Sequence, residues 1–130
     1  MPASIPAAHI RLQRAYDGPT AEDGARILVD RLWPRGLKKE ALALAGWTKE
    51  LAPSTALRQW FHHEPGRWPE FQQRYRAELA ARPEAVQALR AQAQAGTVTL
   101  IYSAHSAEMN NAVVLRDFLL NGATDHETTP

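Results

Sequence analysis

The sequence predicts an α/β domain with a small, mainly parallel sheet that has helices on both faces and is rich in helix. Strand-like segments alternate with helical segments along the chain, an order typical of parallel sheets. The strand-like segment 26–32 is apolar at consecutive positions, which indicates a strand covered on both faces. The length of 130 residues predicts one domain over 1–130, ordered from about 7 to 121 with flexible termini.

The first part of the chain predicts two strands and a short helix. Residues 9–15 alternate between apolar and polar side chains, as a half-buried strand does, and turn residues at 16–19 close this strand. Residues 26–32 form the second predicted strand. Residues 37–45 have the lysine, glutamate, alanine and leucine composition of a short helix, and Gly46 is expected to end it.

The middle of the chain predicts two further helices. Ser54 is a good N-cap for a short helix over 55–62, because its hydroxyl can accept a hydrogen bond from a free backbone N–H. A proline at 65 or 69 suits the first turn of the next helix. Large apolar side chains then recur at helical spacing, which predicts one buried, aromatic-rich stripe. The stripe consists of Trp68, Phe71, Tyr75 and Leu79.

The last third of the chain predicts a helix, a strand and a final helix. Pro83 suits the beginning of the first of these helices, and Gly96 follows its end as a C-cap. Residues 97–102 are rich in β-branched side chains and predict the third strand. The final helix runs through residues 113–119 and is expected to stop at Asn121 and Gly122.

Composition excludes several classes of protein. Hydrophobic residues make up 45% and charged residues 22% of the chain, as in ordinary globular domains. The absence of cysteine excludes disulfides, a thiol nucleophile and thiolate-bound metals. A net charge of +1 gives little support to nucleic-acid binding, which usually needs a dense basic stripe. No signal sequence is visible, and no stretch approaches the ~20 apolar residues that cross a bilayer, so we expect a cytoplasmic protein.

The segment after the second predicted strand indicates a binding site. An apolar run breaks there into charged residues, an aromatic residue, a proline and a glycine. Pro34 fixes its own φ and extends Trp33, so that Arg31 and Arg35 would project from a stiff support. Gly36 would allow a ligand to approach the backbone closely. The segment therefore predicts a site for a negatively charged group.

A second polar loop, residues 103–106, follows the third predicted strand. In open α/β sheets, ligands collect in the crevice outside the carboxyl ends of the strands. If the second and third strands are parallel neighbours, the two loops share one cleft. The helix after Ser106 would direct its free N–H groups and the positive end of its dipole at the same space. This combination favours an anion.

We expect the ligand to be small and to carry a phosphate or a carboxylate, with a nucleotide-like molecule at the upper limit of size. Arg31 and Arg35 would hold it, because the guanidinium fork can bind two oxygens of one anion. Ser103, His105 and Asn110 would add directional hydrogen bonds. Asn110 could instead serve only as a helix cap.

A reaction in this cleft would need a proton carrier. His105 is the best candidate near neutral pH, with Asp30 or Tyr102 to orient it or to act as its partner. The chain has no glycine-rich dinucleotide loop or Walker loop, so the sequence indicates no particular cofactor. His62 and His63 are adjacent on a predicted helix and point about 100° apart, so we expect no metal site there.

The same residues allow two other interpretations. Arg31 and Arg35 could pair with Asp30 and neighbouring carboxylates as structural ties. A non-catalytic module could bind nucleic acid or a regulatory protein through the basic segment, which continues into Lys38 and Lys39. A salt titration separates this module from a small-anion site, because each phosphate contact steepens the dependence of affinity on salt. The identity of the ligand and the oligomeric state stay open.

Several ordered motifs occupy residues 28–36, 47–54, 60–63, 67–79, 100–102 and 110–115. Together they resemble the YeaO-like family of small bacterial proteins of unknown function. The resemblance covers most of the chain, residues 10–119, and implies a bacterial, cytoplasmic, single-domain α/β protein with no assigned activity. Two positions depart from the family pattern. His105 stands where the relatives usually have a long basic side chain, and Lys38 stands where a helix-capping serine is common.

Overall fold

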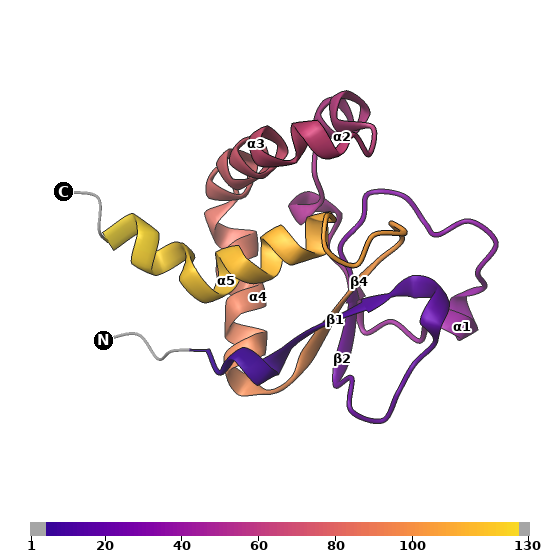
Figure 1. The fold of residues 1–130 in the computed structure, drawn as a ribbon. Coiled ribbons are helices and arrows are strands. Elements are labelled where there is room, and N and C mark those ends of the chain that lie inside the picture. The colour runs from indigo at the N-terminus through magenta and orange to yellow at the C-terminus, as the bar shows by residue number, and fades with distance from the viewer. Residues whose placement is uncertain (1–4, 128–130) are drawn as a thin grey trace.

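One parallel sheet organises the fold. The computed structural model describes residues 5–127. Within this range four strands, β1 (Ile10–Arg14), β2 (Ala25–Leu28), β3 (Gly46–Trp47) and β4 (Val98–Tyr102), form the sheet in the order β1-β4-β2-β3. All three strand pairings are parallel, which confirms the predicted α/β class (Figure 1).

The strand β4 lies between β1 and β2, although it comes last in the sequence. Val98 is level with Ile10 on one side and with Ala25 on the other. All five residues of β4 are buried, as is usual for a central strand of a parallel sheet. Because the strands are parallel, the carboxyl ends of β1, β2 and β4 meet at the same edge of the sheet.

The helices cover the two faces of the sheet unequally. The larger hydrophobic core contains side chains from α2 (Thr55–Phe61), α3 (Trp68–Ala80), α4 (Pro83–Ala95) and α5 (Asn111–Glu127). Figure 1 shows α3, α4 and α5 on one side of the strands and the single turn of α1 (Lys39–Leu42) on the other. None of the helices within the described residues is long and apolar enough to cross a membrane.

The aromatic stripe predicted on α3 is confirmed. Phe71, Tyr75 and Leu79 are buried, and Trp68 is partly buried against the same core. The rings of Phe71 and Phe61 lie 4.5 Å apart between centroids, so the stripe joins α3 to α2. Because Phe61 and Phe71 also line the pocket described below, this part of the core forms one wall of the candidate site.

A smaller core lies on the opposite face of the sheet. It contains Leu28 and Ile101 from the central strands together with Leu42 from α1. Trp47 packs against this group, and its Nε1 donates a hydrogen bond of 2.6 Å to the carbonyl oxygen of Asp30. The indole thus supports the chain where it leaves β2.

The predicted strand at 26–32 is too long. The strand β2 ends at Leu28, and only the N–H of Val29 continues the pairing, to the carbonyl oxygen of Ile101 at 3.0 Å. Beyond this point the chain bends away from the sheet. The carboxylate of Asp30 accepts a hydrogen bond from the N–H of Ser103, and this contact holds the bend. Arg31 and Leu32 therefore belong to the loop.

The predicted helix at 37–45 is also too long, and the sheet has a strand that the sequence does not indicate. The helix α1 is limited to Lys39–Leu42 and ends at Ala43, whose backbone is left-handed with φ of 49°. Gly46 does not cap a helix but begins β3, which pairs with Ile27 and Leu28. A strand of two residues is too short to produce a recognisable alternation.

Two helix ends agree with the sequence, whereas the end of the last helix does not. The hydroxyl of Ser54 accepts a hydrogen bond from the N–H of Leu57, and Gly96 follows α4, both as predicted. The final helix does not stop at Asn121 and Gly122 but continues to Glu127. One glycine inside a helix costs about 1 kcal/mol, which weakens the helix without breaking it. The termini predicted to be flexible include residues 1–4 and 128–130, which lie outside the described residues.

A buried ion pair fixes the amino end of β2, at the edge of the sheet opposite the pocket. Nη1 of Arg26 lies 2.5 Å from Oδ2 of Asp23. Burial alone would raise the pKa of Asp23, but hydrogen bonds from Thr20 and the charge of Arg26 outweigh it and lower the pKa. Gly24, with φ of +62°, crosses closely over Thr97, where a Cβ would lie 2.2 Å from the carbonyl oxygen.

Candidate functional site

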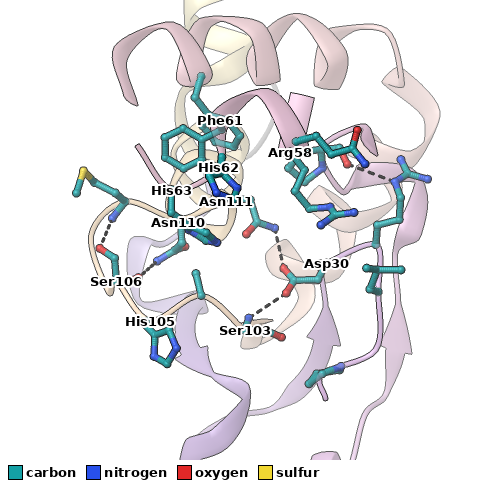
Figure 2. A pocket seen from close by; sticks show the side chains of 18 of the residues that line it. Asp30, Arg58, Phe61, His62, His63, Ser103, His105, Ser106, Asn110 and Asn111 are labelled. Atoms are coloured by element: carbon teal, nitrogen blue, oxygen red, sulfur yellow. Dashed lines mark hydrogen bonds between the residues drawn. The ribbon is translucent and has the colours of Figure 1, made fainter. Parts of the chain in front are cut away.

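A pocket of about 750 Å³ lies at the carboxyl edge of the sheet (Figure 2). Residues 30–35 after β2 line it together with residues 103–106 and 109–111 after β4. The two loops that the sequence assigns to one cleft therefore share this pocket. Further lining comes from α2, the turn that follows it, and α3. The pocket is bounded by segments from both halves of the chain.

Asp30 lies at the junction of the two loops. Its Oδ2 accepts a hydrogen bond of 2.9 Å from the N–H of Ser103, and its Oδ1 accepts one of 3.0 Å from Nδ2 of Asn111. The same amide of Asn111 also donates to the carbonyl oxygen of Val29 at 2.9 Å. Figure 2 shows the contacts of the Asp30 carboxylate with Ser103 and Asn111 as dashed lines. These hydrogen bonds connect the end of β2 to the end of β4 and to the beginning of α5.

Burial raises the pKa of the Asp30 carboxyl above its usual value. The hydrogen bonds from Asn111 and Ser103 and the positive charge of Arg58 act in the opposite direction, but they do not compensate for the loss of hydration. A negative charge on Asp30 is thus held at some cost in free energy. The pocket contains an acid that binds its proton more readily than an exposed aspartate does.

The two predicted anion-binding arginines both line the pocket, and the fold restrains them differently. Arg31 is partly buried, and its Nε donates a hydrogen bond of 3.3 Å to the carbonyl oxygen of Pro53. Arg35 is exposed, and among the described residues its guanidinium has no hydrogen bond or ion pair. Neither guanidinium pairs with Asp30, so the structural ties considered above are not formed there.

A third arginine, Arg58, lines the pocket from α2 and was not predicted. Its guanidinium makes no hydrogen bond or ion pair with the described residues, and Figure 2 shows it reaching toward Asp30. No local pattern marks this residue, because α2 reaches the pocket only through its packing on α3. Asn111 also lines the pocket and contacts Asp30 directly.

His105 lines the pocket at an exposed position. Its Nδ1 lies 3.1 Å from Nη2 of Arg14, at the end of β1. A guanidinium can only donate hydrogen bonds, so Nδ1 must be the acceptor and the proton of the ring lies on Nε2. The contact therefore leaves an N–H donor on the other side of the imidazole.

Ser103 and Asn110 also line the pocket, and the contacts of both hold the loop in place. The N–H of Ser103 donates to Asp30. Asn110 is buried, and its Oδ1 accepts from the N–H of Val113 at 3.0 Å while its Nδ2 donates to the carbonyl oxygen of Ser106 at 2.8 Å. Asn110 thus caps α5, which is the alternative considered for it in the sequence.

Tyr102 is not among the residues that line the pocket. Its side chain is buried in the larger core with Val98 and Leu100, the other residues of the same parity on β4. Burial, followed by the negative charge of Asp17, raises the pKa of its hydroxyl, while Arg14 lowers it. The structure therefore brings Asp30 and His105 to the pocket without Tyr102.

Two consecutive histidines line the pocket in a strained conformation. His62 and His63 have φ values of 44° and 56°, in the left-handed region that side chains with a Cβ disfavour. The helix α2 ends here, and Pro65 prevents Glu64 from continuing it. Such strain is often found at functional sites. Among the described residues, no group of three or more His, Cys, Asp or Glu side chains could hold a metal ion.

The fold and the site together define a parallel α/β protein with an arginine-lined pocket at the carboxyl edge of its sheet. A family model described as "Inactive DUF488-N3 subclade" matches residues 9–129. The chain belongs to this family.

Two relatives illustrate how the family is known. The uncharacterized protein YeaO of Escherichia coli K12 is 47% identical over 111 residues, which cover 85% of this chain and 96% of the relative. The uncharacterized protein Rv3073c of Mycobacterium tuberculosis H37Rv is 39% identical over 113 residues, which cover 87% and 94%. These relatives confirm the resemblance to the YeaO-like family. No solved structure matches the chain.

Proposed function

We propose that this protein binds a small anion, a phosphate- or carboxylate-bearing molecule of at most nucleotide size, in the pocket at the carboxyl edge of the sheet. The observation that carries the proposal is the charge of the lining. Among the described residues that line the pocket, three arginines face one aspartate, and three histidines add N–H donors. We take the protein to lie in the cytoplasm of a bacterium, where such anions are abundant.

The three arginines offer different numbers of nitrogen donors to a ligand. Arg35 and Arg58 have guanidinium groups without a hydrogen bond or ion pair in the described part of the chain, so both are available to ligand oxygens. Arg31 uses Nε on Pro53 and keeps its two terminal nitrogens for the pocket. The N–H on Nε2 of His105 supplies a directional hydrogen bond, and the positive end of the α5 dipole adds a weaker attraction.

The function is binding rather than turnover. The description of the family as inactive favours this choice. The contacts of Asp30 point the same way, because Ser103 and Asn111 already occupy one lone pair on each carboxylate oxygen. A catalytic version of the proposal would use His105 as the proton carrier and Asp30 as its partner. That version requires turnover of the bound anion and fails if the anion leaves unchanged.

The alternative of a nucleic-acid- or protein-binding module has less support. Lys38 and Lys39, which would extend the basic surface, do not line the pocket. An extended polyanion would contact several cations at once, so its affinity would fall steeply with salt. A single small anion in a concave site gives a shallow dependence. The slope of affinity against salt therefore separates the two functions.

The test is a calorimetric titration with inorganic phosphate, methyl phosphate and acetate. We expect at least one of these anions to bind, with weaker binding by Arg58→Gln. The matched control is Lys39→Gln, which removes an exposed charge outside the pocket and should leave binding unchanged. Equal losses in both variants would indicate attraction by net charge alone. The absence of binding by all three anions would contradict the proposal.

A further inference from the structure

The size of the pocket exceeds what a bare anion needs. Its volume of about 750 Å³ falls within the range of about 300–1,000 Å³ that is usual for sites of organic ligands. An inorganic anion needs only a few donors within about 3 Å of its oxygens. Most of the space would then lie against apolar side chains. A ligand that fills the pocket must therefore have an uncharged body beside its anionic group.

The large hydrophobic side chains that the fold leaves exposed gather at this pocket. Among the described residues they are Tyr16, Leu32 and Trp33, with 41%, 59% and 36% of their surface exposed. All three line the pocket. A single exposed hydrophobic residue is common, but a group of them at one concave site is typical of a binding surface.

The two exposed aromatic rings are held in place by their own polar atoms. The Nε1 of Trp33 donates a hydrogen bond of 2.7 Å to the carbonyl oxygen of Leu37. The rings of Trp33 and Trp47 pack in a T-shaped arrangement with their centroids 5.5 Å apart. The hydroxyl of Tyr16 donates to the carbonyl oxygen of Arg35 at 2.9 Å. Because these polar groups have partners, the rings offer a ligand mainly apolar surface. On Tyr16 this is the face that the guanidinium of Arg14, 4.7 Å from the ring centroid, leaves uncovered. Fixed rings lose little conformational entropy on binding.

The aromatic and cationic groups are adjacent in the same loop. Trp33 and Arg35 are separated only by Pro34, which is buried and fixes its own φ. Phe61, from the larger core, contributes a further aromatic side chain to the lining. An anionic group on Arg35 would thus bring whatever is attached to it beside aromatic side chains.

We propose that the ligand is an aromatic anion, a planar ring system that carries a phosphate or a carboxylate. This inference rests on the proposed function and specifies the part of the ligand that does not carry the charge. The anionic group binds the arginines, and the ring packs against Trp33 and Tyr16. Planarity matters because flat rings stack on fixed indole and phenol rings, whereas saturated groups of the same size cannot.

The test compares ligands that carry the same charge on different bodies. Methyl, cyclohexyl and phenyl phosphate are titrated into the whole protein under the same conditions. We expect phenyl phosphate to bind about tenfold more tightly than methyl phosphate, and more tightly than cyclohexyl phosphate, because only the phenyl ring can stack. Acetate and benzoate form the matching pair for a site that prefers carboxylates.

Variants at Trp33 assign the preference to this ring. Trp33→Ala should remove most of the advantage of phenyl over methyl phosphate, measured as the ratio of the two affinities in the same variant. Trp33→Phe keeps an aromatic ring and should retain most of the advantage. The melting temperature of each variant verifies that it is folded. The comparison of ligands on the natural protein does not depend on either variant.

The outcomes separate this inference from the proposed function. If methyl and phenyl phosphate bind equally, or if cyclohexyl phosphate equals phenyl phosphate, the aromatic preference is wrong and anion binding stands. If the preference exists but Trp33→Ala leaves it unchanged, the ring does not pack where we infer. If none of the phosphates or carboxylates binds, the proposed function fails, and this inference fails with it.

Discussion

Asp30 and Arg35 are oppositely charged side chains in one pocket, and they differ in their hydrogen-bond partners. The carboxylate of Asp30 is fixed by hydrogen bonds from Ser103 and Asn111. The guanidinium of Arg35 has no such partner within the described residues. A charge bound by the donors of the fold shapes the pocket. A charge without a partner is available to a ligand.

The first prediction concerns Arg35. The Arg35→Ala variant should keep the free energy of unfolding within about 0.5 kcal/mol of the natural protein, because the side chain is exposed and unpaired. Its affinity for the anion should fall. Arg35→Lys should keep the fold and still bind more weakly than the natural protein, because an ammonium group cannot reproduce the guanidinium fork.

The measurements are denaturant unfolding and calorimetric titration of the same preparations. Lys38→Ala serves as the control, since this exposed cation does not line the pocket. A loss of about 3–5 kcal/mol of stability by Arg35→Ala, with unchanged binding in the fraction that folds, would identify the arginine as a structural tie.

The second prediction concerns the raised pKa of Asp30. Between the usual aspartate pKa of about 3.9 and the higher value in the folded state, the folded protein holds a proton that the unfolded chain has lost. The contribution of Asp30 to the free energy of unfolding should therefore decrease as the pH rises through this window. In Asp30→Asn this contribution is absent, so the variant should gain stability relative to the natural protein as the pH rises.

Denaturant unfolding of both proteins at several pH values between about 3 and 7 measures this difference. The asparagine also changes a hydrogen bond to Ser103 or Asn111, but that change shifts the curve equally at all pH values. The slope is therefore the diagnostic quantity. A difference that is constant with pH, or that falls, would contradict the raised pKa.

Those residues of the candidate site that come shortly after the end of a strand could be predicted from the sequence. Asp30, Arg31 and Arg35 after β2, and His105 after β4, all line the pocket as expected from the rule for parallel sheets. Arg58 could not be found in this way, because the packing of helices brings it there. Tyr102 does not line the pocket. The alternation of side chains along β4 directs it to the same side of the sheet as Leu100, so its position in the core could be predicted from the sequence.

At the scale of elements, types were easier to predict than boundaries. The long apolar segment of β4 and the stripe on α3 produced correct elements because their burial depends on many residues. The end of β2 depends on one carboxylate that binds a distant backbone N–H, and no local pattern contains that contact. The two residues of β3 are held by pairing with β2 rather than by their own preference.

The third prediction tests the stripe on α3. Phe71→Ala should lower the free energy of unfolding by about 3–5 kcal/mol, because the ring is buried against Phe61 and Tyr75 and its removal leaves a cavity. Gln73→Ala, at an exposed position of the same helix, should change it by less than about 0.5 kcal/mol. Denaturant unfolding measures both. Equal stability of the two variants would mean that this face of α3 is not part of the core.

The fourth prediction tests the crossing at Gly24. Gly24→Ala should destabilise the fold by about 2–4 kcal/mol, because the new Cβ would lie 2.2 Å from the carbonyl oxygen of Thr97 and φ is +62°. Gly66→Ala is the matched control, since a Cβ there meets nothing within 4 Å. Thermal unfolding of the two variants gives the comparison. Similar melting temperatures would contradict the close crossing.

At the scale of the whole molecule, the pocket belongs to the same cooperative unit as the sheet. Because the loops after β2 and β4 form its walls, an anion that binds there should stabilise the entire domain. At about 100 times its dissociation constant, a ligand adds about 2.7 kcal/mol to the free energy of unfolding, or roughly 10 °C in melting temperature. A thermal-shift series in methyl and phenyl phosphate measures this. Two separate transitions, with only one moved by ligand, would show that the pocket unfolds independently.

The position of β4 in the sequence determines when the sheet can form during synthesis on the ribosome. The strands β1 and β2 emerge early, but each pairs with β4, which is made in the last third of the chain. The sides of β1 and β2 that pair with β4 stay unpaired while the helices before β4 are synthesised, although β2 can already pair with β3 on its other side. Contacts of such long sequence separation form slowly. An incomplete chain that ends before β4 lacks the strand that joins the other two. The sheet and its pocket can therefore be completed only after β4 has been synthesised.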